Sequence, residues 1–482
     1  MKRTLLIQLG AAIVIGIGLR FVVNLEPVWW LAWFAPGLLL ALALRTEGWT
    51  SRGLVALAAL IGVTANTSYL LKVMPLVPVI TVTLLQTLLW FFVVGTTRRV
   101  VQKFDAGWTV LAYPVIGVAA DTLLAHLTPD GNWGSLAYTQ AEVLPIAQLA
   151  SVFGVSGVLF VLMLVNSALA LAVYRGLRMP GALPAYTAAA AIFAATAIVG
   201  WWRLQTPVTG TPVNFGIVSI DDFLQGPDGD PAREVWRRYD AQVTALAAGG
   251  ARTILLPEKI VVMSAADAEA RKSHFAKLAA ANHVWLVAGL GVDNGKERRN
   301  EAWWFAPDGH LATNYLKHFM APPEREFVSG SEYPVNAIDG VNYGVAICKD
   351  MHFASLGREF GARDTAVMLV PAWDFHDDAW MAASMTNLRG VENGYTVVRS
   401  SRDGLLSVSD PYGRLIAVAT SSPFPGTSLF ASATVGQRVS TIYTRIGDAL
   451  GWGCLAGALA MIIGAGVRKR RIAGAGSGAL VR

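Results

Sequence analysis

The chain contains the run Tyr343-Gly-Val-Ala-Ile-Cys348, in which apolar residues lead directly to a cysteine. A short apolar run of this kind predicts a buried strand, with Cys348 at its end. Two other runs have the same form, Thr253-Ile-Leu-Leu-Pro-Glu258 and Asn314-Tyr-Leu-Lys317. Catalytic groups concentrate in loops at the ends of strands that a rigid sheet holds in place. The thiol, the carboxylate and the ammonium are therefore candidates for one site, although an isolated Glu or Lys after a strand is more often a surface or ion-pair residue.

The region around these runs, from Pro212 to about Thr441, alternates short β-rich runs with polar stretches of helical character. This alternation predicts an α/β sandwich. Helices are predicted at Pro231–Ala248 and Ala265–Asn282. Strands are predicted at Asn214–Ile220, Thr253–Leu256, Val284–Gly289, Glu301–Phe305, Tyr343–Ile347, Ala366–Val370, Tyr395–Ser400 and Leu405–Ser409.

The rest of the chain is strongly apolar. Hydrophobic residues make up 54% of the 482 residues, which is too much for an ordinary soluble protein. Runs near the length that crosses a bilayer, roughly 20 residues, lie at about 4–23, 28–44, 53–71, 74–95, 108–125, 152–174, 183–202 and 446–467. We therefore expect a bundle of about eight membrane helices: seven within 1–203, then a polar domain at 212–441, a last helix at 446–467 and a basic tail at 468–482. The first run lacks a small-residue cleavage site, so we interpret it as an uncleaved span rather than a signal peptide.

Basic residues alternate between the two sides of this eight-span arrangement. One side carries Lys2, Arg3, Arg45, Arg52, Arg98, Arg99, Lys103, Arg175, Arg178 and Arg468 to Arg471, whereas the loops at 24–27 and 126–141 carry no Lys or Arg. The positive-inside rule assigns the basic side to the cytoplasm. The polar domain is then expected outside the cytoplasm, in a protein of the inner membrane. The net charge of +6 largely flanks apolar segments, so no nucleic-acid partner is expected.

The two cysteines lie in very different surroundings. Cys348 follows a predicted strand of the polar domain, and Cys454 lies within the last apolar run. A disulfide between them is unfavourable because one of the two would sit in lipid. A lone cysteine is commonly a small buried hydrophobe, so the neighbours of Cys348 decide its interpretation.

Taken together, the Glu, Lys and Cys runs resemble the nitrilase (carbon-nitrogen hydrolase) superfamily, in which these three catalytic residues each follow a strand, in this order. Further matching motifs are Asn300 with Ala302, Pro307-Asp-Gly309, Phe327 to Gly330, Arg389-Gly-Val-Glu392-Asn-Gly and Asp410-Pro-Tyr-Gly413. The resemblance implies that the polar domain is a nitrilase-like α-β-β-α sandwich.

The membrane part is similar to the apolipoprotein N-acyltransferase branch of that superfamily, and this resemblance extends over nearly the whole chain. The matching residues are Gly131-Asn-Trp133-Gly-Ser-Leu-Ala-Tyr138, Gln140, Gln148, Gly154 and Asn166, and, after the polar domain, Ile442-Tyr-Thr-Arg-Ile-Gly-Asp448. The resemblance implies a two-step transfer, in which Cys348 takes an acyl chain from a membrane phospholipid as a thioester. The α-amino group of a diacylated apolipoprotein then accepts that chain. No metal ion or other cofactor is expected.

In this scheme Glu258 is the base, and Lys317 favours the thiolate and stabilises the oxyanion. The second carboxylate of nitrilases matches Glu324, with Glu326 as the alternative. Trp373, Phe375, Trp380 and Met381 are candidate contacts for an acyl chain, and they are equally well explained as core or interface aromatics.

The residues after the nucleophile, Cys348-Lys349-Asp350, depart from the Cys-Tyr-Glu that is typical of the acyltransferases. Asp350 keeps a carboxylate on a shorter side chain, and Lys349 replaces an aromatic ring with a cation. The catalytic residue types are intact, so the departure bears on the substrate rather than on the chemistry. Two other hypotheses therefore stay open: a membrane-tethered amidase in which water takes the place of the amine, and a silent scaffold or transporter.

Overall fold

The computed structural model describes residues 2–221, 224 and 230–475. The chain divides into two compact units. The helical unit comprises Met1–Thr128, Gly134–Trp201 and Asp448–Arg482, and the sandwich unit comprises Pro129–Trp133 and Trp202–Gly447. The short 129–133 segment thus belongs to the sandwich unit although the chain on both sides of it belongs to the helical unit.

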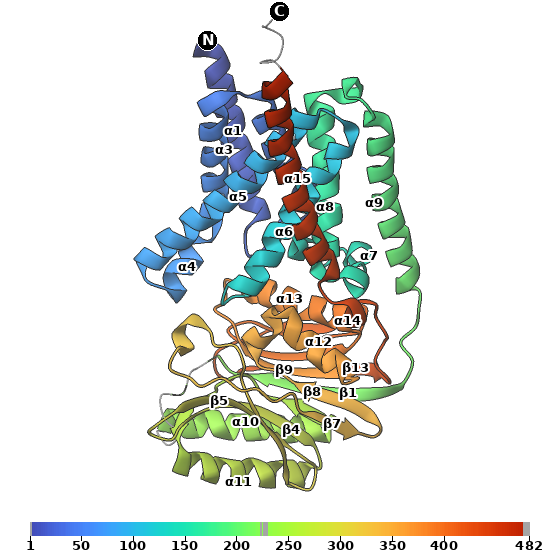
Figure 1. Ribbon diagram of the computed structural model, residues 1–482. Coiled ribbons are helices and arrows are strands. Elements are labelled where there is room, and N and C mark those ends of the chain that lie inside the picture. The colour runs from blue at the N-terminus through green and yellow to red at the C-terminus, as the bar shows by residue number, and fades with distance from the viewer. Residues whose placement is uncertain (1, 222–223, 225–229, 476–482) are drawn as a thin grey trace, which may run out of the picture. The chain divides into compact units, whose positions relative to one another are not determined.

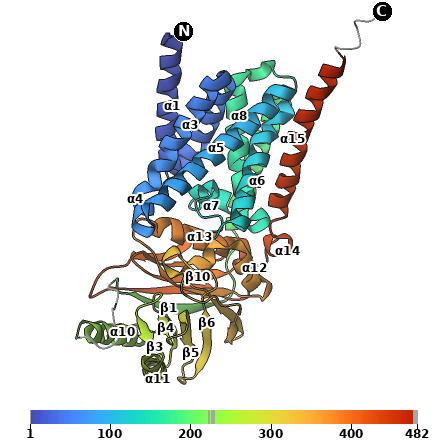
Figure 2. The same ribbon diagram turned by 60° about the vertical axis from the view of Figure 1, so that its left-hand side comes forward.

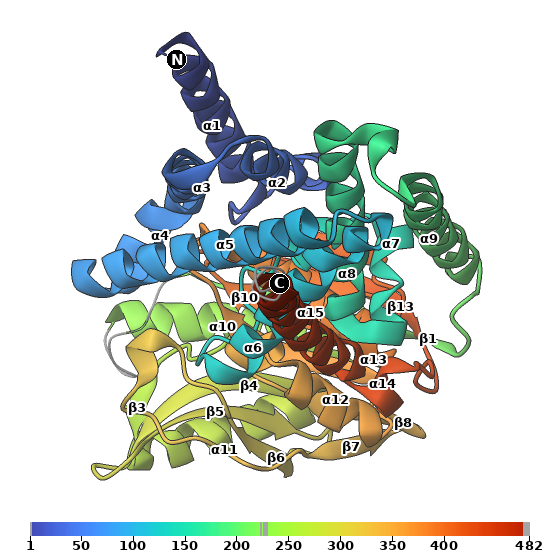
Figure 3. The ribbon, with the colours of Figure 1, turned by 45° about the horizontal axis from the view of Figure 1, so that its top comes forward.

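The helical unit is built from long apolar helices (Figure 1 and Figure 3). Its main helices are α1 (Lys2–Val22), α2 (Ala35–Arg45), α3 (Gly48–Val63), α4 (Thr67–Val73), α5 (Leu76–Phe104), α6 (Ala112–Leu127), α7 (Leu144–Ala147), α8 (Ala150–Tyr174), α9 (Ala182–Leu204) and α15 (Ala449–Ala475). Short 3₁₀ turns lie between them at Trp29–Trp33, Thr64–Asn66, Gly107–Leu111, Leu136–Gln140 and Gly176–Arg178.

Among the described residues, seven helices are long and apolar enough to cross a membrane: Arg3–Val22, Gly48–Val73, Leu76–Phe104, Gly107–Leu127, Ala150–Tyr174, Ala182–Leu204 and Ala449–Gly466. The remaining predicted span is Trp29–Arg45, which is apolar but shorter. A bundle of this kind is a multi-pass membrane protein. The last helix continues to Ala475, so residues 468–475, predicted as part of a tail, are helical, and the tail from 476 lies outside the described residues.

Asn166 joins α8 to α2 in the middle of the helical unit. Its amide oxygen accepts the N–H of Gly37 at 2.7 Å, and its amide nitrogen donates to the carbonyl oxygens of Ala32 at 2.9 Å and Leu162 at 2.8 Å. A side chain at position 37 would meet the Asn166 carbonyl oxygen at 2.7 Å, so glycine allows the two backbones to approach. Helix α2 is therefore packed inside the bundle.

The described residues of the sandwich unit form two β-sheets. The first has the order β13-β1-β2-β4-β5-β6, with β3 paired to β4, and the second has the order β12-β11-β10-β9-β8-β7. Their strands are β1 (Thr211–Ser219), β2 (Thr253–Leu255), β3 (Val262–Ser264), β4 (Trp285–Asp293), β5 (Arg298–Phe305), β6 (Leu311–Leu316), β7 (Val335–Ile338), β8 (Val341–Val345), β9 (Val367–Trp373), β10 (Thr396–Arg402), β11 (Leu405–Ser409), β12 (Leu415–Thr420) and β13 (Thr427–Val435).

The centre of each sheet is parallel, β1-β2-β4 in the first and β8-β9-β10 in the second. Parallel strands are covered on both faces, which is why they appear in the sequence as continuous apolar runs. One core cluster lies between the sheets and includes Phe215, Leu255, Val345, Leu369 and Val398. Burying each such side chain contributes about 1.5–3 kcal/mol to folding.

Helices cover the outer faces of both sheets, giving four layers (Figure 1 and Figure 2). Helices α10 (Asp230–Ala248) and α11 (Ala265–Asn282) cover the first sheet, with Trp236, Tyr239 and Phe275 in the core beneath them. Helices α12 (Ala354–Ala362) and α13 (Ala379–Asn393) cover the second, and the short α14 (Tyr443–Ile446) packs against them. The predicted α-β-β-α sandwich is therefore confirmed.

Each of the eight predicted strands overlaps an observed strand, and the run before Lys317 is β6. The sequence did not indicate β3, β7, β12 or β13. Strands β7 and β12 lie at the edges of the second sheet and β13 at an edge of the first. Exposed and covered residues are mixed along them, so they lack the continuous apolar run of a central strand.

Candidate active site

Glu258 lies just after β2, where backbone hydrogen bonds connect the chain to both sheets. The N–H of Leu256 donates to the Val287 carbonyl oxygen of β4 at 2.8 Å, and the N–H of Glu258 donates to the Ala372 carbonyl oxygen of β9 at 3.2 Å. A side chain at Gly289 would come within 2.5 Å of the Glu258 Cα atom. Glycine at position 289 therefore lets this loop cross close above β4.

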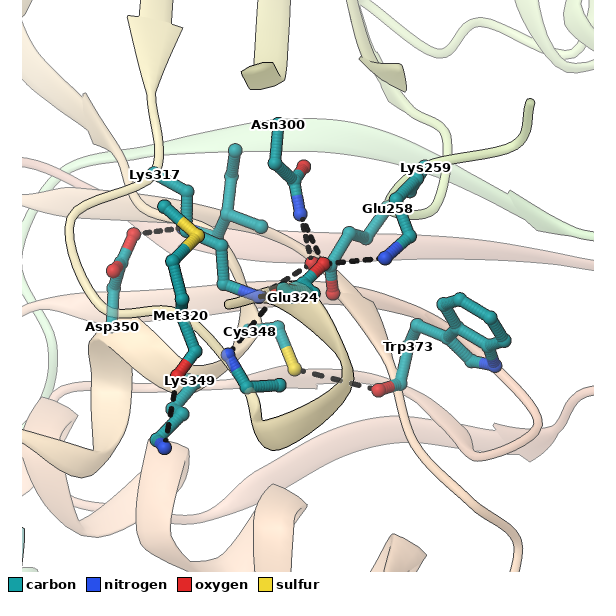
Figure 4. Close-up of polar contacts among 12 residues, drawn as sticks. Glu258, Lys259, Asn300, Lys317, Met320, Glu324, Cys348, Lys349, Asp350 and Trp373 are labelled. Carbon is teal, nitrogen blue, oxygen red and sulfur yellow. Dashed lines mark hydrogen bonds and ion pairs between the residues drawn. The ribbon is translucent and has the colours of Figure 1, made fainter. Parts of the chain in front are cut away.

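Lys317 follows β6 and reaches the Glu258 carboxylate (Figure 4). Its Nζ atom donates to Oε1 of Glu258 at 2.7 Å and to Oε2 of Glu324 at 2.7 Å. All three side chains are at most 3% exposed. Glu324 is thus the second carboxylate in contact with Lys317. Glu326, the alternative, is 75% exposed and forms an ion pair with Arg298 at 2.6 Å.

Two further side chains complete this buried cluster. Asn300 donates to Oε1 of Glu258 at 2.6 Å and to Oε1 of Glu324 at 2.8 Å. The Lys259 ammonium contacts Oε1 of Glu324 at 2.5 Å. The sequence indicated Asn300 only as part of a matching motif, and Lys259 was not predicted as a site residue. The sequence does contain one indication of Lys259: it places a cation directly after the carboxylate that follows a buried strand.

The cluster pairs two carboxylates with two ammonium groups in a buried environment. Burial alone would lower the pKa of Lys317, but the Glu258 and Glu324 carboxylates outweigh it and hold this pKa well above its ordinary value. Burial opposes ionisation of Glu324 too, yet Lys317 and Lys259 together lower its pKa to about 2. Lys317 is therefore a cation and Glu324 an anion at neutral pH.

Cys348 opens the 3₁₀ turn Cys348–His352 directly after the second-sheet strand β8. Its backbone has a φ of +45°, a left-handed conformation that costs a non-glycine residue of order 1–3 kcal/mol. Strain of this kind is found where a fold holds a functional side chain in place. The residue as a whole is half-buried. Its Sγ atom donates to the Trp373 carbonyl oxygen at 3.5 Å and lies beside the carboxylate–ammonium cluster (Figure 4).

The thiol is neutral in this resting arrangement. Burial raises the pKa of Cys348 well above its ordinary value of 9.0, and the Glu258 carboxylate raises it further, although the Lys317 ammonium opposes them. The Lys317 ammonium thus favours the thiolate but does not make it the resting form. The electrostatics instead indicate that the proton leaves as the sulfur attacks, and a carboxylate nearby is the group that could accept it.

Asp350 is fully buried and forms hydrogen bonds to two loops, the one after Lys317 and the one that leads to Cys348. Its carboxylate accepts the N–H of Ile347 at 2.9 Å, the N–H groups of His318 at 3.1 Å and Phe319 at 2.9 Å, and the hydroxyl of Tyr315 at 2.7 Å. The loop after Lys317 is thereby tied to the turn of Cys348. These hydrogen bonds make Asp350 a structural link between the two loops.

The side chains predicted as contacts for an acyl chain lie in different surroundings. The Trp373 ring lies 3.8 Å from the Arg402 guanidinium and 4.9 Å from the Lys259 ammonium, and its indole N–H donates to Asp403 at 2.8 Å. Phe375 lies beside this ring at 6.0 Å between centroids. Trp380 is half-buried near the start of α13, and the following Met381 is buried.

One group of side chains in the described part of the chain has the spacing of metal ligands. It consists of Asp221, His376 and Asp403, whose ligating atoms lie within 4.8 Å of one another. Asp221 accepts the N–H of Asp403 at 2.9 Å, and Asp403 contacts His376 at 3.1 Å. These contacts pair the members with one another, and the cluster does not include the Glu258, Lys317 and Cys348 side chains.

Comparisons with known proteins match both parts of the chain. Residues 17–168 match the family model of the apolipoprotein N-acyltransferase N-terminal domain, and residues 230–425 match that of the carbon-nitrogen hydrolases. The apolipoprotein N-acyltransferase of Geobacter metallireducens is 25% identical over 406 residues, which are 75% of each chain. That of Azotobacter vinelandii is 22% identical over 71% of this chain and 72% of its own.

Among solved structures, an amidase from Nesterenkonia sp. is similar with a TM-score of 0.43 and 19% identity, over 51% of this chain and 97% of its own. The two family models follow each other in the order of the helical and sandwich units, and the relatives span both. The chain belongs to the apolipoprotein N-acyltransferases, the membrane-embedded branch of the carbon-nitrogen hydrolase superfamily.

Proposed function

We propose that this protein transfers a fatty acyl chain from a membrane phospholipid, through a thioester on Cys348, to the α-amino group of the lipidated N-terminal cysteine of lipoproteins. The observation that carries this proposal is the combination, in one chain, of a multi-pass helical bundle with a buried carboxylate–ammonium cluster beside a cysteine. Both substrates are anchored in lipid, so a membrane-embedded enzyme can reach them where a soluble amidase could not.

In the first half-reaction the Cys348 sulfur attacks the ester carbonyl carbon of the phospholipid as its proton passes to Glu258. The negative charge that develops on the carbonyl oxygen is stabilised by the Lys317 ammonium. The intermediate collapses when the C–O bond of the ester breaks, and the departing alkoxide takes the proton from Glu258. The products are a lysophospholipid and an acyl thioester on Cys348.

In the second half-reaction the α-amino group of the acceptor attacks the thioester carbonyl carbon. Glu258 accepts a proton from the attacking nitrogen, the C–S bond breaks, and the proton returns to the sulfur. The product is an amide, and the neutral thiol is restored. Lys317 stays charged throughout, because Glu324 and Glu258 hold its proton, so it serves as an electrostatic group rather than as a proton carrier.

The test is an acceptor assay on the purified full chain. Incubation with a phospholipid labelled in its acyl chain is expected to give a protein adduct that hydroxylamine removes. Addition of a diacylated lipopeptide is then expected to discharge the adduct into amide-linked lipopeptide. Release of free fatty acid instead would identify a hydrolase, and absence of any adduct would reject the thioester mechanism.

We further propose that the sandwich unit faces the outside of the inner membrane. Arg45 of α2 donates to the Val173 carbonyl oxygen of α8, and Arg98 of α5 donates to that of Ala43, so these basic residues lie at one end of the bundle. The opposite end holds Trp33, whose indole N–H donates to Gln140 at 3.0 Å. Trp29–Arg45 therefore connects the two ends despite its short length, which supports its role as a span.

Helix α9 leads from the basic end to the opposite end. The N–H of Gly107 donates to the Pro180 carbonyl oxygen just before α9, and the far end of α9 meets α7 at Gly200, where a side chain would overlap the Pro145 carbonyl oxygen. The positive-inside rule assigns the basic end to the cytoplasm. The chain after α9 then emerges on the outside.

Labelling of single cysteines in intact spheroplasts is expected to agree with this orientation. In a chain without its two native cysteines, Lys296→Cys on an exposed turn of the sandwich unit should react with a membrane-impermeant maleimide. Leu177→Cys, at a 70% exposed position of the basic end, should react only after permeabilisation. The reverse pattern would overturn the proposed orientation.

A further inference from the structure

Lys349, the residue directly after the nucleophile, is a buried cation that joins three parts of the chain. Its side chain is 6% exposed, and its Nζ atom contacts Oδ1 of Asp130 at 2.6 Å. The same Nζ atom donates to the Met320 carbonyl oxygen at 3.1 Å, as Figure 4 shows. Met320 lies in the loop between Lys317 and Glu324. Lys349 thus ties the turn of Cys348 to the loop that carries the catalytic ammonium.

Asp130 belongs to the 129–133 segment, which leaves the helical unit after Thr128 and returns to it at Gly134. This segment has two further contacts with the sandwich unit. Gly131 has a φ of +63°, and a side chain there would come within 2.9 Å of the His352 carbonyl oxygen. The Asn132 side-chain oxygen accepts from Arg389 of α13 at 3.4 Å. The segment therefore lies against both the start and the end of the Cys348–His352 turn.

Burial of the Lys349 ammonium explains why it forms an ion pair with Asp130. An ammonium that is 6% exposed has lost most of its hydration, so it needs a charged partner or it reorients toward water. Met320 supplies only a neutral carbonyl oxygen. Without the Asp130 carboxylate, the Lys349 side chain is expected to move, and with it the backbone that holds Cys348 at its strained φ of +45°.

We propose that Asp130 is a positioning residue for the nucleophile and acts through Lys349. This inference rests on the proposed function, because it assigns Asp130 to the step in which Cys348 becomes acylated. Thioester formation then depends on the 129–133 segment. The chain on both sides of this segment belongs to the helical unit. A misplacement of reacting atoms by about 1 Å can cost about 10²-fold in rate.

Single-turnover acylation of the full chain by labelled phospholipid tests this proposal. Asp130→Asn is expected to slow acylation roughly 10-fold or more, with the half-saturating donor concentration and the thermal midpoint close to those of the unmodified chain. Lys349→Met should have a similar effect. Because both changes remove the same contact, the double variant should be no slower than the slower single variant, and Asp130→Glu should recover part of the rate.

Glu326→Gln is the matched control, because its ion pair with Arg298 has the same 2.6 Å length but is largely exposed. It should acylate at the normal rate. Normal acylation by Asp130→Asn would overturn the proposal. So would a double variant whose loss of rate is the product of the two single losses. A slower rate that is explained by a lower thermal midpoint would overturn it too.

A second measurement keeps the inference separate from the proposed function. The rate at which iodoacetamide alkylates Cys348, in a Cys454→Ala background, reports the position of the thiol without any lipid substrate. Asp130→Asn should change this rate about threefold or more, and Glu326→Gln should not. If the unmodified chain forms no acyl adduct, the proposed function fails, whereas the alkylation rates still decide whether Asp130 positions Cys348.

Discussion

We expect replacement of Cys348 with alanine to abolish the hydroxylamine-sensitive acyl adduct and to lower transfer to a lipopeptide by on the order of 10⁴-fold or more. The reason is that no other described side chain of the site offers a nucleophilic sulfur, since Cys454 lies in α15 of the helical unit. Cys348→Ser has the same consequence, because a hydroxyl has a higher pKa than a thiol and is not activated where even the thiol rests protonated. Adduct formation is measured with labelled phospholipid on the purified chain.

Cys454→Ala serves as the control for this prediction. It removes the other cysteine of the chain, buried among apolar residues, and should leave both the adduct and the transfer rate unchanged. An adduct that persists in Cys348→Ala, or disappears in Cys454→Ala, would show that Cys348 is not the nucleophile. Thermal unfolding of both variants separates loss of chemistry from loss of folding.

The sequence predicted the strands after which the proposed catalytic side chains lie. Strand β2 before Glu258 is a buried apolar run and β8 before Cys348 is buried in its second half, whereas β6 before Lys317 is partly polar and mostly half-buried or exposed. A buried strand leaves a strong local signal, and the residue after it has a defined position. For the same reason the long apolar helices were predicted to within a few residues at most ends.

Features that depend on the tertiary structure could not be predicted in this way. Asn300 lies on β5 and Lys259 in the loop after β2, and both contact the Glu324 carboxylate in the 3₁₀ turn Pro322–Glu324. No local sequence pattern records that convergence. Asp130 lies more than 200 residues before its partner Lys349. The left-handed backbone of Cys348 and the neutral thiol follow from packing and burial, which the sequence of the turn alone does not contain.

Lys317→Met is expected to lower the acylation rate about 10³-fold, because it removes the cation placed to stabilise the oxyanion. It also leaves the Glu258 carboxylate without its buried ion-pair partner, which should cost about 3–5 kcal/mol of folding free energy. Lys259 remains beside Glu324, so the loss is concentrated on Glu258. Lys272→Met is the control, because Lys272 pairs with a 74% exposed Glu269 on α11, and it should change neither rate nor stability appreciably.

The destabilisation by Lys317→Met should depend on pH in a defined direction. In the unmodified chain the pKa of Glu324 is lowered from 4.5 to about 2, so its contribution to stability is present above 4.5 and is lost as the pH falls toward 2. In the variant, Glu324 loses one of the two ammonium groups that lower its pKa, so less of this stability remains above pH 4.5. The difference in thermal midpoint between the two proteins should therefore be largest at neutral pH and shrink as the pH falls from 4.5 toward 2. A difference that stays constant or grows on acidification would show that Lys317 does not hold Glu324 in its charged form.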